Sequence, residues 1–434
     1  MTSEPSSHPR GQRVVIAAAV ATTLPGLALR VSGSHPVEWL GAVLFGLAIV
    51  GAAFLLAWAA EAVQLDVSQG LALALLALIA VLPEYAVDFV FTWKAGEDPD
   101  EFAPLALANM TGANRLLIGV GWSMVVLLAA YRLRKAASEG RSRGPVNTDI
   151  SLERSHAIEI AFLAVATLYS LTLPLKRTLT LVDTAVLVTV FVLYVVRISR
   201  APAEEPHLVG PAQLVGSLPV RQRRMAIAVM FLFAAGVILA CAEPFADALV
   251  TAGEELGIST FLLVQWVAPL ASEAPELLVA GLFAWRLNTN AALGALVSSK
   301  VNQWTLLVGT LPLVFALSAA TTHGLPIDAV QREELFLTAA QSAFAVAVLS
   351  NRRLGVREAL TLLGLFLGQF VMSGVLPDNL RSFERVGFGV AYLVLAAGTL
   401  YQQRRALPRL VHDGFRTDVN ELVRNDDVPA EEPI

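Results

Sequence analysis

The chain has 434 residues, of which 56% are hydrophobic and 15% are charged, and its formal net charge is -5 at pH 7. Soluble globular proteins are usually about one-quarter charged, so this composition excludes an ordinary soluble domain and favours an integral membrane protein. The single cysteine, Cys241, excludes a disulfide framework within one chain, and the mildly acidic balance gives no sign of a nucleic-acid-binding protein.

The apolar runs predict about twelve membrane-spanning helices, because a bilayer core requires about 20 mostly apolar residues per helix. In chain order, the predicted helices cover residues 13–31, 37–63, 68–93, 103–131, 156–173, 180–198, 225–251, 259–285, 290–318, 333–350, 356–376 and 385–402. The first run lacks a clear cleavage site, so it predicts a span rather than a signal peptide. The polar segment after Tyr401 predicts a mobile tail. The predicted fold class is all-α, a polytopic transmembrane helix bundle.

Basic residues predict the orientation of these helices, because cytoplasmic loops are enriched in Lys and Arg. With the N-terminus inside, the loops predicted to be cytoplasmic hold most of the basic residues, including Arg132, Arg134 and Lys135. The acidic loop of residues 97–101 falls outside. Both termini are therefore predicted to be cytoplasmic. The composition, rich in Ala, Val, Leu and Arg, favours a prokaryotic cytoplasmic membrane, with the lipid bilayer as a partner.

Two regions of the chain, residues 74–121 and 262–309, are similar to each other. Each contains a Pro-Glu pair within a predicted helix, a short polar turn, and a second helix that begins with small residues. Pro83 and Pro275 are expected to break their helices, because proline removes a backbone donor. Duplication with broken helices is a common plan of secondary transporters, in which the ion site lies near the bilayer midplane.

The two repeats are predicted to be inverted, because five predicted helices separate the start of one from the start of the other, and an odd number reverses the direction of insertion. The predicted organisation is an N-terminal tail with an extra helix, the first repeat, a cytoplasmic linker, the second repeat with an extra helix, and a cytoplasmic tail. In that order, these segments cover residues 1–36, 37–198, 199–224, 225–402 and 403–434.

Acidic residues inside the predicted spans mark a candidate cation site, because ionisable groups in a bilayer are costly and usually face a cavity or a partner. Glu84 and Asp88 are four residues apart and share a helix face, as do Glu273 and Glu276, which are three apart. Carboxylates with amides nearby suit Ca²⁺, Na⁺, Mg²⁺ or protons. The nearby amides are those of Asn109, Asn114 and Asn302.

Two basic residues inside predicted spans, Arg115 and Lys300, allow a different interpretation. They could form salt bridges with the carboxylates and hold the bundle together, in which case the protein would be a non-transporting scaffold or sensor. For Glu84 and Glu276, beside the prolines, ion binding is the favoured interpretation. No phosphate loop or nucleophile constellation is present in the sequence, so no enzyme and no cofactor are predicted.

These motifs resemble the sodium/calcium exchanger (Ca²⁺:cation antiporter) family. Each of its two inverted repeats carries a Gly-Thr-Ser-Leu-Pro-Glu stretch on one helix and a Gly-Asn/Asp-x-x-Gly-Ser-Asn stretch on the next. Here, the matching segments are residues 82–84 and 108–114 in the first half and residues 274–276 in the second. The resemblance implies that Glu84 and Glu276 are the central Ca²⁺ ligands and that Asn109 assists them.

The chain departs from the family pattern in ways that change the expected ion chemistry. Ala80-Val81 replaces the Thr-Ser hydroxyls that the family uses for Na⁺, and the corresponding residues of the second half are Ser272 and Glu273. Lys300 stands where the family has Asn. A fixed cation can take the place of a bound ion and lowers the pKa of nearby carboxylates. Proton coupling is therefore favoured over a three-sodium cycle.

The predicted function is a secondary active cation antiporter that exchanges Ca²⁺ or Na⁺ against H⁺ or another cation by alternating access. Glu84 and Glu276 would bind the cation, Asn109 and Glu273 would support it, and Lys300 would compete with it or carry the proton. The other supporting or charge-compensating residues are Asp88, Asn114, Arg115, Ser272 and Asn302. An anionic substrate stays open as an alternative, because a basic residue in the site would also fit an anion.

Overall fold

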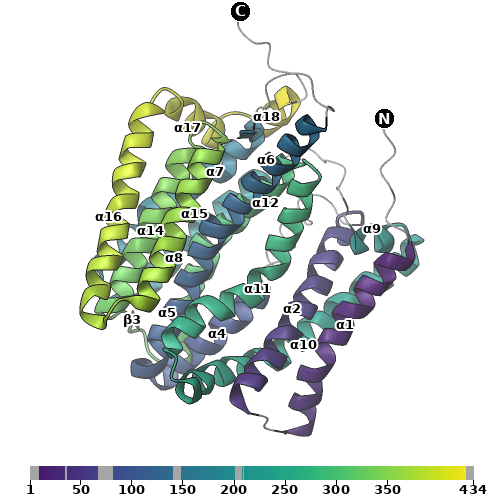
Figure 1. Ribbon diagram of the computed structural model, residues 1–434, viewed down its shortest axis with the longest axis vertical. Coiled ribbons are helices and arrows are strands. Elements are labelled where there is room, and N and C mark those ends of the chain that lie inside the picture. Colours follow the sequence, from purple (N-terminus) through teal and green to yellow (C-terminus); the bar gives the residue numbers. More distant parts are fainter. Residues whose placement is uncertain are drawn as a thin grey trace, which may run out of the picture. The chain divides into compact units, whose positions relative to one another are not determined.

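The computed structural model describes residues 9–34, 37–66, 82–139, 148–200, 208 and 210–426. The chain divides into two compact units, and each takes segments from both halves of the sequence. Unit 1 comprises residues 1–91 and 203–276, and unit 2 comprises residues 92–202 and 277–434. Figure 1 labels most of the helices of both units.

The described part of unit 1 is built from helices. They are α1 (Pro9–Ser32), α2 (Glu38–Val63), the first part of α4 (Leu82–Glu97), α9 (Pro211–Gly216), α10 (Val220–Leu256) and most of α11 (Thr260–Trp285). Two of the three divisions between the units fall within a helix, one in α4 and one in α11, and the third lies outside the described residues. The helix α10 is followed directly by Gly257, which has a φ of 63° and so adopts the left-handed conformation that glycine tolerates best.

Unit 2 is also helical, apart from two pairs of two-residue strands. Its α-helices are α5 (Pro99–Leu116), α6 (Ser123–Ser138), α7 (Ala157–Ser170), α8 (Leu181–Ile198), α12 (Thr289–Asn302), α13 (Val308–Ser318), α14 (Ala329–Leu349), α15 (Val356–Val375), α16 (Asp378–Gln402), α17 (Leu407–Phe415) and α18 (Val419–Asp426). The short helical segments are η1 (Leu117–Trp122), η2 (Arg154–His156), η3 (Leu173–Leu175) and η4 (Gln303–Leu307). The antiparallel strand pairs are β1 (Ile150–Ser151) with β4 (Arg353–Leu354), and β2 (Thr178–Leu179) with β3 (Leu325–Pro326).

Among the described residues, ten helical segments are long and apolar enough to cross a membrane. Two of the twelve predicted spans are not among them. The helix α14 has four polar or charged residues at positions 331–334 in its first turns. The predicted span of residues 68–93 lies partly outside the described residues, and its described part, residues 82–93, belongs to α4. The polytopic helical class predicted from the sequence is confirmed.

In unit 1, α2 and α10, the equivalent first long helices of the two repeats, pack in opposite directions. Just beyond the end of α2, Asp66 accepts a hydrogen bond of 2.7 Å from Arg223, near the start of α10. Toward the other end of the pair, the ring of Phe245 lies against Gly46. Small buried residues along α2 allow this close approach.

The equivalent helices of unit 2 also run in opposite directions. Asn114 on α5 contacts Lys300 on α12, and Arg132, further along α6, donates to the backbone oxygen of Trp285, before the start of α12. Residue numbers therefore rise along one repeat as they fall along the other. Both units show the inverted arrangement that the sequence predicts.

The second helix of each repeat begins with the same kind of cap. Asp98 accepts a hydrogen bond of 3.3 Å from the backbone of Glu101 at the start of α5, and Asn288 accepts one of 3.4 Å from Ala291 at the start of α12. A side-chain oxygen at this position satisfies a backbone N–H that the helix leaves unpaired. The polar turns of the sequence repeats are therefore helix starts.

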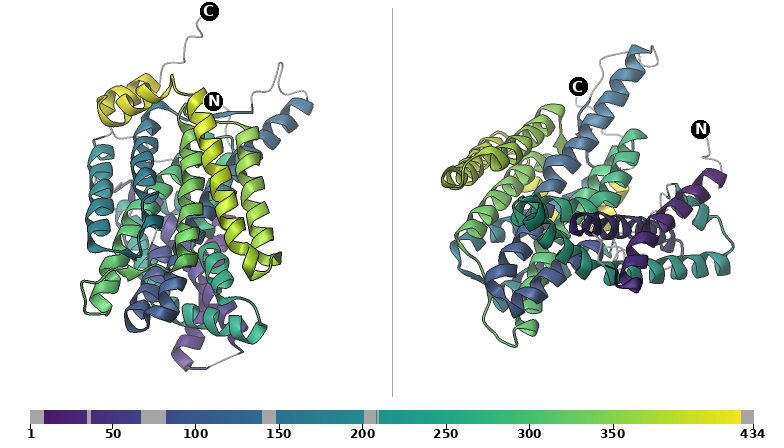
Figure 2. Two further views of the ribbon diagram at one scale, coloured as in Figure 1. Left: turned by 90° about the vertical axis from the view of Figure 1, so that its left-hand side faces the viewer. Right: turned by 60° about the horizontal axis from the view of Figure 1, so that its bottom comes forward.

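Two predictions about the fold are wrong. Pro275 does not break its helix, because α11 continues through both Pro269 and Pro275 to Trp285. A proline inside a helix removes a single backbone hydrogen bond, and the helix continues around it here. The segment after Tyr401 is not a mobile tail as far as residue 426, because it forms α17 and α18, which pack against η2 and α7 (Figure 2).

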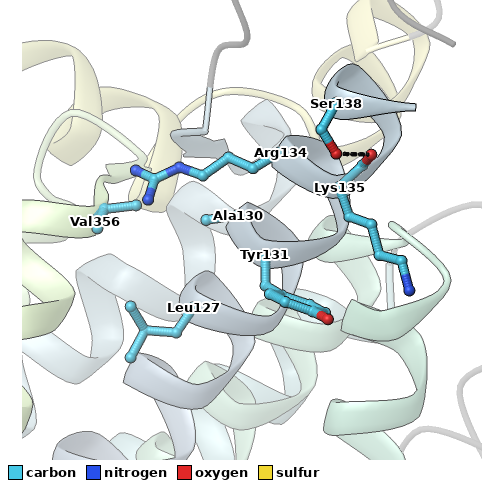
Figure 3. Close-up of a pocket in the computed structure, with 7 residues that line it drawn as sticks. All are labelled: Leu127, Ala130, Tyr131, Arg134, Lys135, Ser138 and Val356. Atoms are coloured by element: carbon cyan, nitrogen blue, oxygen red, sulfur yellow. Dashed lines mark hydrogen bonds between the residues drawn. The ribbon is translucent and has the colours of Figure 1, made fainter. Parts of the chain in front are cut away.

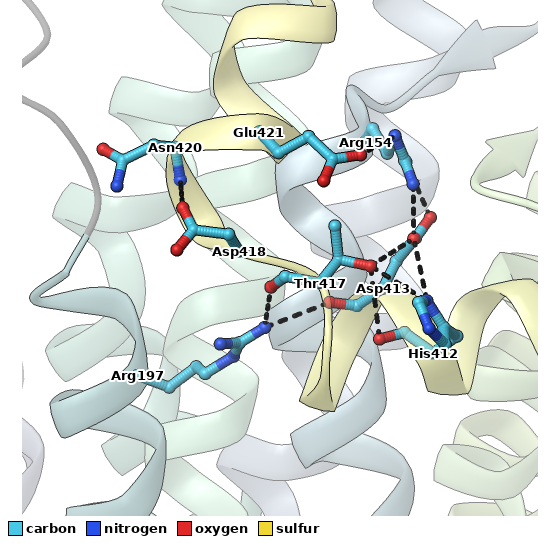
Figure 4. A network of polar contacts seen from close by, with 8 residues as sticks. All are labelled: Arg154, Arg197, His412, Asp413, Thr417, Asp418, Asn420 and Glu421. Atoms are coloured by element: carbon cyan, nitrogen blue, oxygen red, sulfur yellow. Dashed lines mark hydrogen bonds and ion pairs between the residues drawn. The ribbon is translucent and has the colours of Figure 1, made fainter.

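A polar network holds these C-terminal helices in place (Figure 4). The Arg154 guanidinium donates two hydrogen bonds, of 2.8 and 2.7 Å, to the Asp413 carboxylate on α17. Arg197, at the end of α8, donates to backbone oxygens of Gly414 and Thr417. Burial favours the neutral acid, but the hydrogen bonds from Arg154 and Thr417 hold the pKa of Asp413 below its ordinary value. The tail is therefore fixed by charge-assisted hydrogen bonds.

Candidate functional site

The four carboxylates predicted to bind a cation all belong to unit 1. Glu84 and Asp88 lie one turn apart in α4, and both are buried, with relative exposures of 2% and 0%. In α11, Glu273 is 2% exposed and Glu276 is partly buried. Burial of carboxylates on two apolar helices costs free energy unless the carboxylates pair with another group or bind a ligand. Ser272, beside Glu273, donates to carbonyl oxygens of its own helix, those of Ala268 and Pro269.

The amides and the two basic residues predicted for the site belong to unit 2. All five of these residues are buried, and they are Asn109, Asn114 and Arg115 on α5 and Lys300 and Asn302 on α12. The structure therefore groups the sequence-predicted residues by chemistry, with the carboxylates in one unit and the amides and fixed cations in the other.

Lys300 is completely buried and contacts the equivalent residue of the other repeat. Its ammonium group donates to the backbone oxygen of Asn114 at 2.7 Å and to the Oδ1 atom of Asn114 at 2.5 Å. The Asn114 amide nitrogen donates to Met110 within α5 at 2.9 Å. The ammonium also lies 5.3 Å from the centroid of the Trp304 ring, a cation–π geometry. These contacts disperse a buried charge that would otherwise be very costly.

Arg115 makes a salt bridge that the sequence motifs do not predict. Its guanidinium lies 2.9 Å from the Glu334 carboxylate on α14, and both side chains are buried. It also donates to Gln369 on α15 at 3.2 Å, while Gln341 donates to the Arg115 backbone oxygen at 3.4 Å. The sequence signal for a polar partner on this helix is the run of polar residues 331–334, which overlaps the start of the predicted helix 333–350. These contacts explain how one of the two buried cations is compensated.

The helix changes from α to π geometry at equivalent places in the two repeats. The helix α5 passes into a π-helical segment, η1, at Leu117, and α12 passes into another, η4, at Gln303. Each segment begins three residues after the aligned pair formed by Asn114 and Lys300. Single-turn π segments inside α-helices often occur at functional sites. No separate signal in the sequence predicts them.

Among the described residues, no group of three or more His, Cys, Asp and Glu side chains is placed to hold a metal ion. A cation bound by Glu84 or Glu276 would therefore need amide, hydroxyl, backbone or water oxygens as well. Such mixed oxygen ligands are normal for Ca²⁺. An ion that is transported is a substrate rather than a resident metal, so a permanent cage of carboxylates is not required.

Comparison of the sequence with models of known protein families identifies the family of this chain. Residues 37–199 and 226–375 match the sequence model of the family described as "Sodium/calcium exchanger protein". The chain belongs to the sodium/calcium exchanger family. Comparison with curated proteins gives no match.

Solved structures of exchangers share the fold of this family member. The structure titled "Crystal Structure of H+/Ca2+ Exchanger CAX" is 40% identical, covers 95% of this chain and 99% of its own, and superimposes with a TM-score of 0.85. A Ca²⁺/H⁺ antiporter, YfkE, is 14% identical, with a TM-score of 0.56 over 89% of this chain and 100% of its own. The sodium-calcium exchanger NCX_Mj is 16% identical, with a TM-score of 0.50 over 78% of this chain and 99% of its own. This family member is therefore an integral membrane protein of the cation-exchanger type.

Proposed function

We propose that this chain is a secondary active antiporter that exchanges Ca²⁺ against protons by alternating access. The observation that carries the proposal is the 40% identity, over 95% of the chain, to a protein whose structure is titled an H⁺/Ca²⁺ exchanger. The two carboxylate pairs of unit 1, of which three members are buried and Glu276 is partly buried, offer the hard, anionic oxygens that Ca²⁺ prefers.

Within this proposal, Glu84 and Glu276 are the principal ligands of the cation, and Glu273 and Asp88 add negative charge from the same two helices. Protons compete with Ca²⁺ for the same carboxylates, because a protonated carboxyl loses its negative charge and part of its acceptor capacity. Exchange of one Ca²⁺ for protons then needs no titratable group other than these carboxylates. Asn109, on α5, is proposed as an assisting ligand from its place in the family motif.

Lys300 and Arg115 have defined roles in the proposal. Both are buried, and both contact polar groups of unit 2, Lys300 at Asn114 and Arg115 at Glu334. We assign Arg115 to stabilisation of the bundle. Lys300 occupies the position at which the family motif has Asn, so this position offers an ammonium donor in place of an amide oxygen that could coordinate a cation such as Na⁺.

The test is ion flux in proteoliposomes under an imposed pH gradient, with Ca²⁺ and Na⁺ examined separately. Wild type is compared with Glu276→Gln and with Glu243→Gln, a matched control in which an exposed carboxylate is neutralised. We expect Ca²⁺ uptake driven by the pH gradient in wild type and Glu243→Gln, and none in Glu276→Gln.

Two outcomes would overturn the proposal. Uptake of Na⁺ but not Ca²⁺ would make the protein a Na⁺/H⁺ antiporter. No flux of either ion, in protein shown to be folded, would favour a non-transporting scaffold or sensor. A Ca²⁺ flux that persists in Glu276→Gln would leave the function intact and would remove Glu276 as a principal ligand.

A further inference from the structure

One face of α6, continued from η1 before it, changes from apolar to basic along its length. The residues Val120, Met124 and Leu127 line a cavity of about 320 Å³ together with Leu363 of α15. Leu127 also lines the next cavity, of about 560 Å³, whose wall continues through Tyr131 to the end of the helix. The two cavities therefore share a wall and follow one helix face, at the spacing of three and four residues that places side chains above one another.

The basic end of this face carries two exposed cations. Arg134 and Lys135 line the larger cavity with Ser138 and with Val356, the first residue of α15. Figure 3 shows Arg134 reaching toward Val356 and Lys135 extending beside Tyr131. Neither basic side chain makes a salt bridge within the part of the chain that the structure describes. Their charge is available for a ligand.

The neighbouring Arg132 lines neither cavity and contacts Trp285 instead. It donates to the Trp285 backbone oxygen at 3.2 Å, and its guanidinium lies 4.7 Å from the Trp285 ring centroid. Tyr131 stacks on the same ring, with the two centroids 6.1 Å apart. Exposed Tyr and Trp side chains of membrane proteins gather at the boundary between the acyl chains and the headgroups. The ring pair therefore marks the depth of that boundary.

The order of groups along α6 matches that of a phospholipid. The apolar cavity lies on one side of Tyr131, and Arg134 and Lys135 lie about one turn away on the other side. The nearest acidic residue further along the helix, Glu139, lies beyond both. From Val120 to Leu128, the helix rises about 12 Å, which is most of the depth of one leaflet of hydrocarbon.

We propose that this face of α6, together with the start of α15, binds an anionic phospholipid. One acyl chain lies along Val120, Met124 and Leu127, and the phosphate lies at Arg134 and Lys135. Basic sites between transmembrane helices on the cytoplasmic side recognise anionic headgroups, and this end of α6 is the one predicted to be cytoplasmic. The site uses none of the carboxylates of unit 1 and does not depend on the proposed transport activity.

The experiment measures thermal unfolding of the full chain, purified in a neutral detergent, with added phosphatidylglycerol or phosphatidylcholine at constant salt. Three proteins are compared, namely wild type, Arg134→Gln/Lys135→Gln and Arg10→Gln/Arg221→Gln. The last is a matched control, because it removes two exposed basic residues that line neither cavity. Glycerol phosphate serves as a headgroup without acyl chains.

We expect phosphatidylglycerol to raise the unfolding temperature of wild type and of the control variant more than phosphatidylcholine does. The Arg134→Gln/Lys135→Gln variant should require roughly 10- to 30-fold more phosphatidylglycerol for the same shift. Equal shifts of the unfolding temperature in all three proteins would overturn the assignment of the lipid site to Arg134 and Lys135. An equal shift with glycerol phosphate would identify a free anion as the ligand and would overturn the assignment to a lipid. No difference between the two lipids in wild type would also overturn it.

Discussion

Lys300 donates hydrogen bonds to two oxygens of Asn114, the residue at the equivalent position of the other repeat. The inverted repeats therefore meet at a pair in which one member supplies a charge and the other supplies its acceptors. Two asparagines at this crossing would be neutral. Substitution of one of them by lysine places a cation in the bundle, and the remaining Asn114 supplies two of the acceptors that solvate it.

Replacement of Lys300 by methionine should destabilise the protein, because two buried oxygens of Asn114 lose their donor. The expected cost is about 1–3 kcal/mol in the free energy of unfolding. The measurement is thermal unfolding of the single variants Lys300→Met and Asn114→Ala and of the double variant. A coupling energy close to zero would show that the contact contributes nothing to stability.

The salt bridge between Arg115 and Glu334 predicts a larger loss. The variant Glu334→Gln removes the carboxylate 2.9 Å from a buried guanidinium, and such changes cost about 3–5 kcal/mol. The matched control is Glu243→Gln, which breaks the exposed pair with Arg30 and should cost less than about 1 kcal/mol. Equal unfolding temperatures for the two variants would contradict this interpretation of Arg115.

Gly294 in α12 is expected to reject any side chain. A Cβ atom at this position would lie 2.3 Å from the Cε1 atom of His156, so Gly294→Ala must displace that ring. The expected cost is roughly 1–3 kcal/mol. Gly236→Ala is the control, because its Cβ would meet nothing within 4 Å and alanine is the better helix former. If both variants unfold at the wild-type temperature, the packing against His156 is not tight.

Asp66 predicts a loss of stability in acid. Its hydrogen bonds with Arg223, and to a smaller extent with Arg224, lower the pKa of the carboxyl to about 2 against the opposing effect of burial. A lowered pKa stabilises the folded state above the ordinary value near 3.8, and this stabilisation disappears as the pH falls toward 2. Between pH 5 and pH 2, wild type should therefore lose about 1–2 kcal/mol more than Asp66→Asn. Parallel stability curves for the two proteins would exclude this role.

The docked tail predicts a change in protease sensitivity. Asp413→Asn removes the charge that accepts two hydrogen bonds from Arg154, so α17 should detach more often and cleavage after Tyr401 should become faster. The control is Glu421→Gln, because Glu421 lies 3.6 Å from Arg154 and is half-exposed. Cleavage at the same rate in wild type and Asp413→Asn would show that other contacts hold the tail.

The sequence predicted most of the architecture because its signals are periodic or duplicated. The lengths of the apolar runs located the spans. The count of helices between the motifs predicted the inversion of the repeats, which is confirmed by the hydrogen bond from Arg223, near the start of α10, to Asp66, just beyond the end of α2. The helix ends were less accurate. The predicted helix 225–251 extends to 220–256, because polar residues continue the helix beyond the apolar run.

The contacts of the buried cations could not be predicted, because they depend on residues outside the duplicated motifs. Glu334 lies more than 200 positions from Arg115, in a helix that has no counterpart among the quoted repeat segments. The π segments were missed for a different reason, since they depend on how α5 and α12 are packed. The roles of Glu84, Glu273 and Glu276 as ligands stay predictions, and the flux experiment tests them.

The crossing of the two repeats has a consequence for how the protein can be redesigned. Because Lys300 and Asn114 are chemically unlike, the first repeat cannot be copied into the place of the second without loss of the buried ammonium group. A chimera with two first halves would place Asn opposite Asn, and one with two second halves would place two ammonium groups in contact. The halves have thus become complementary parts, and each is specific for its own place in the chain.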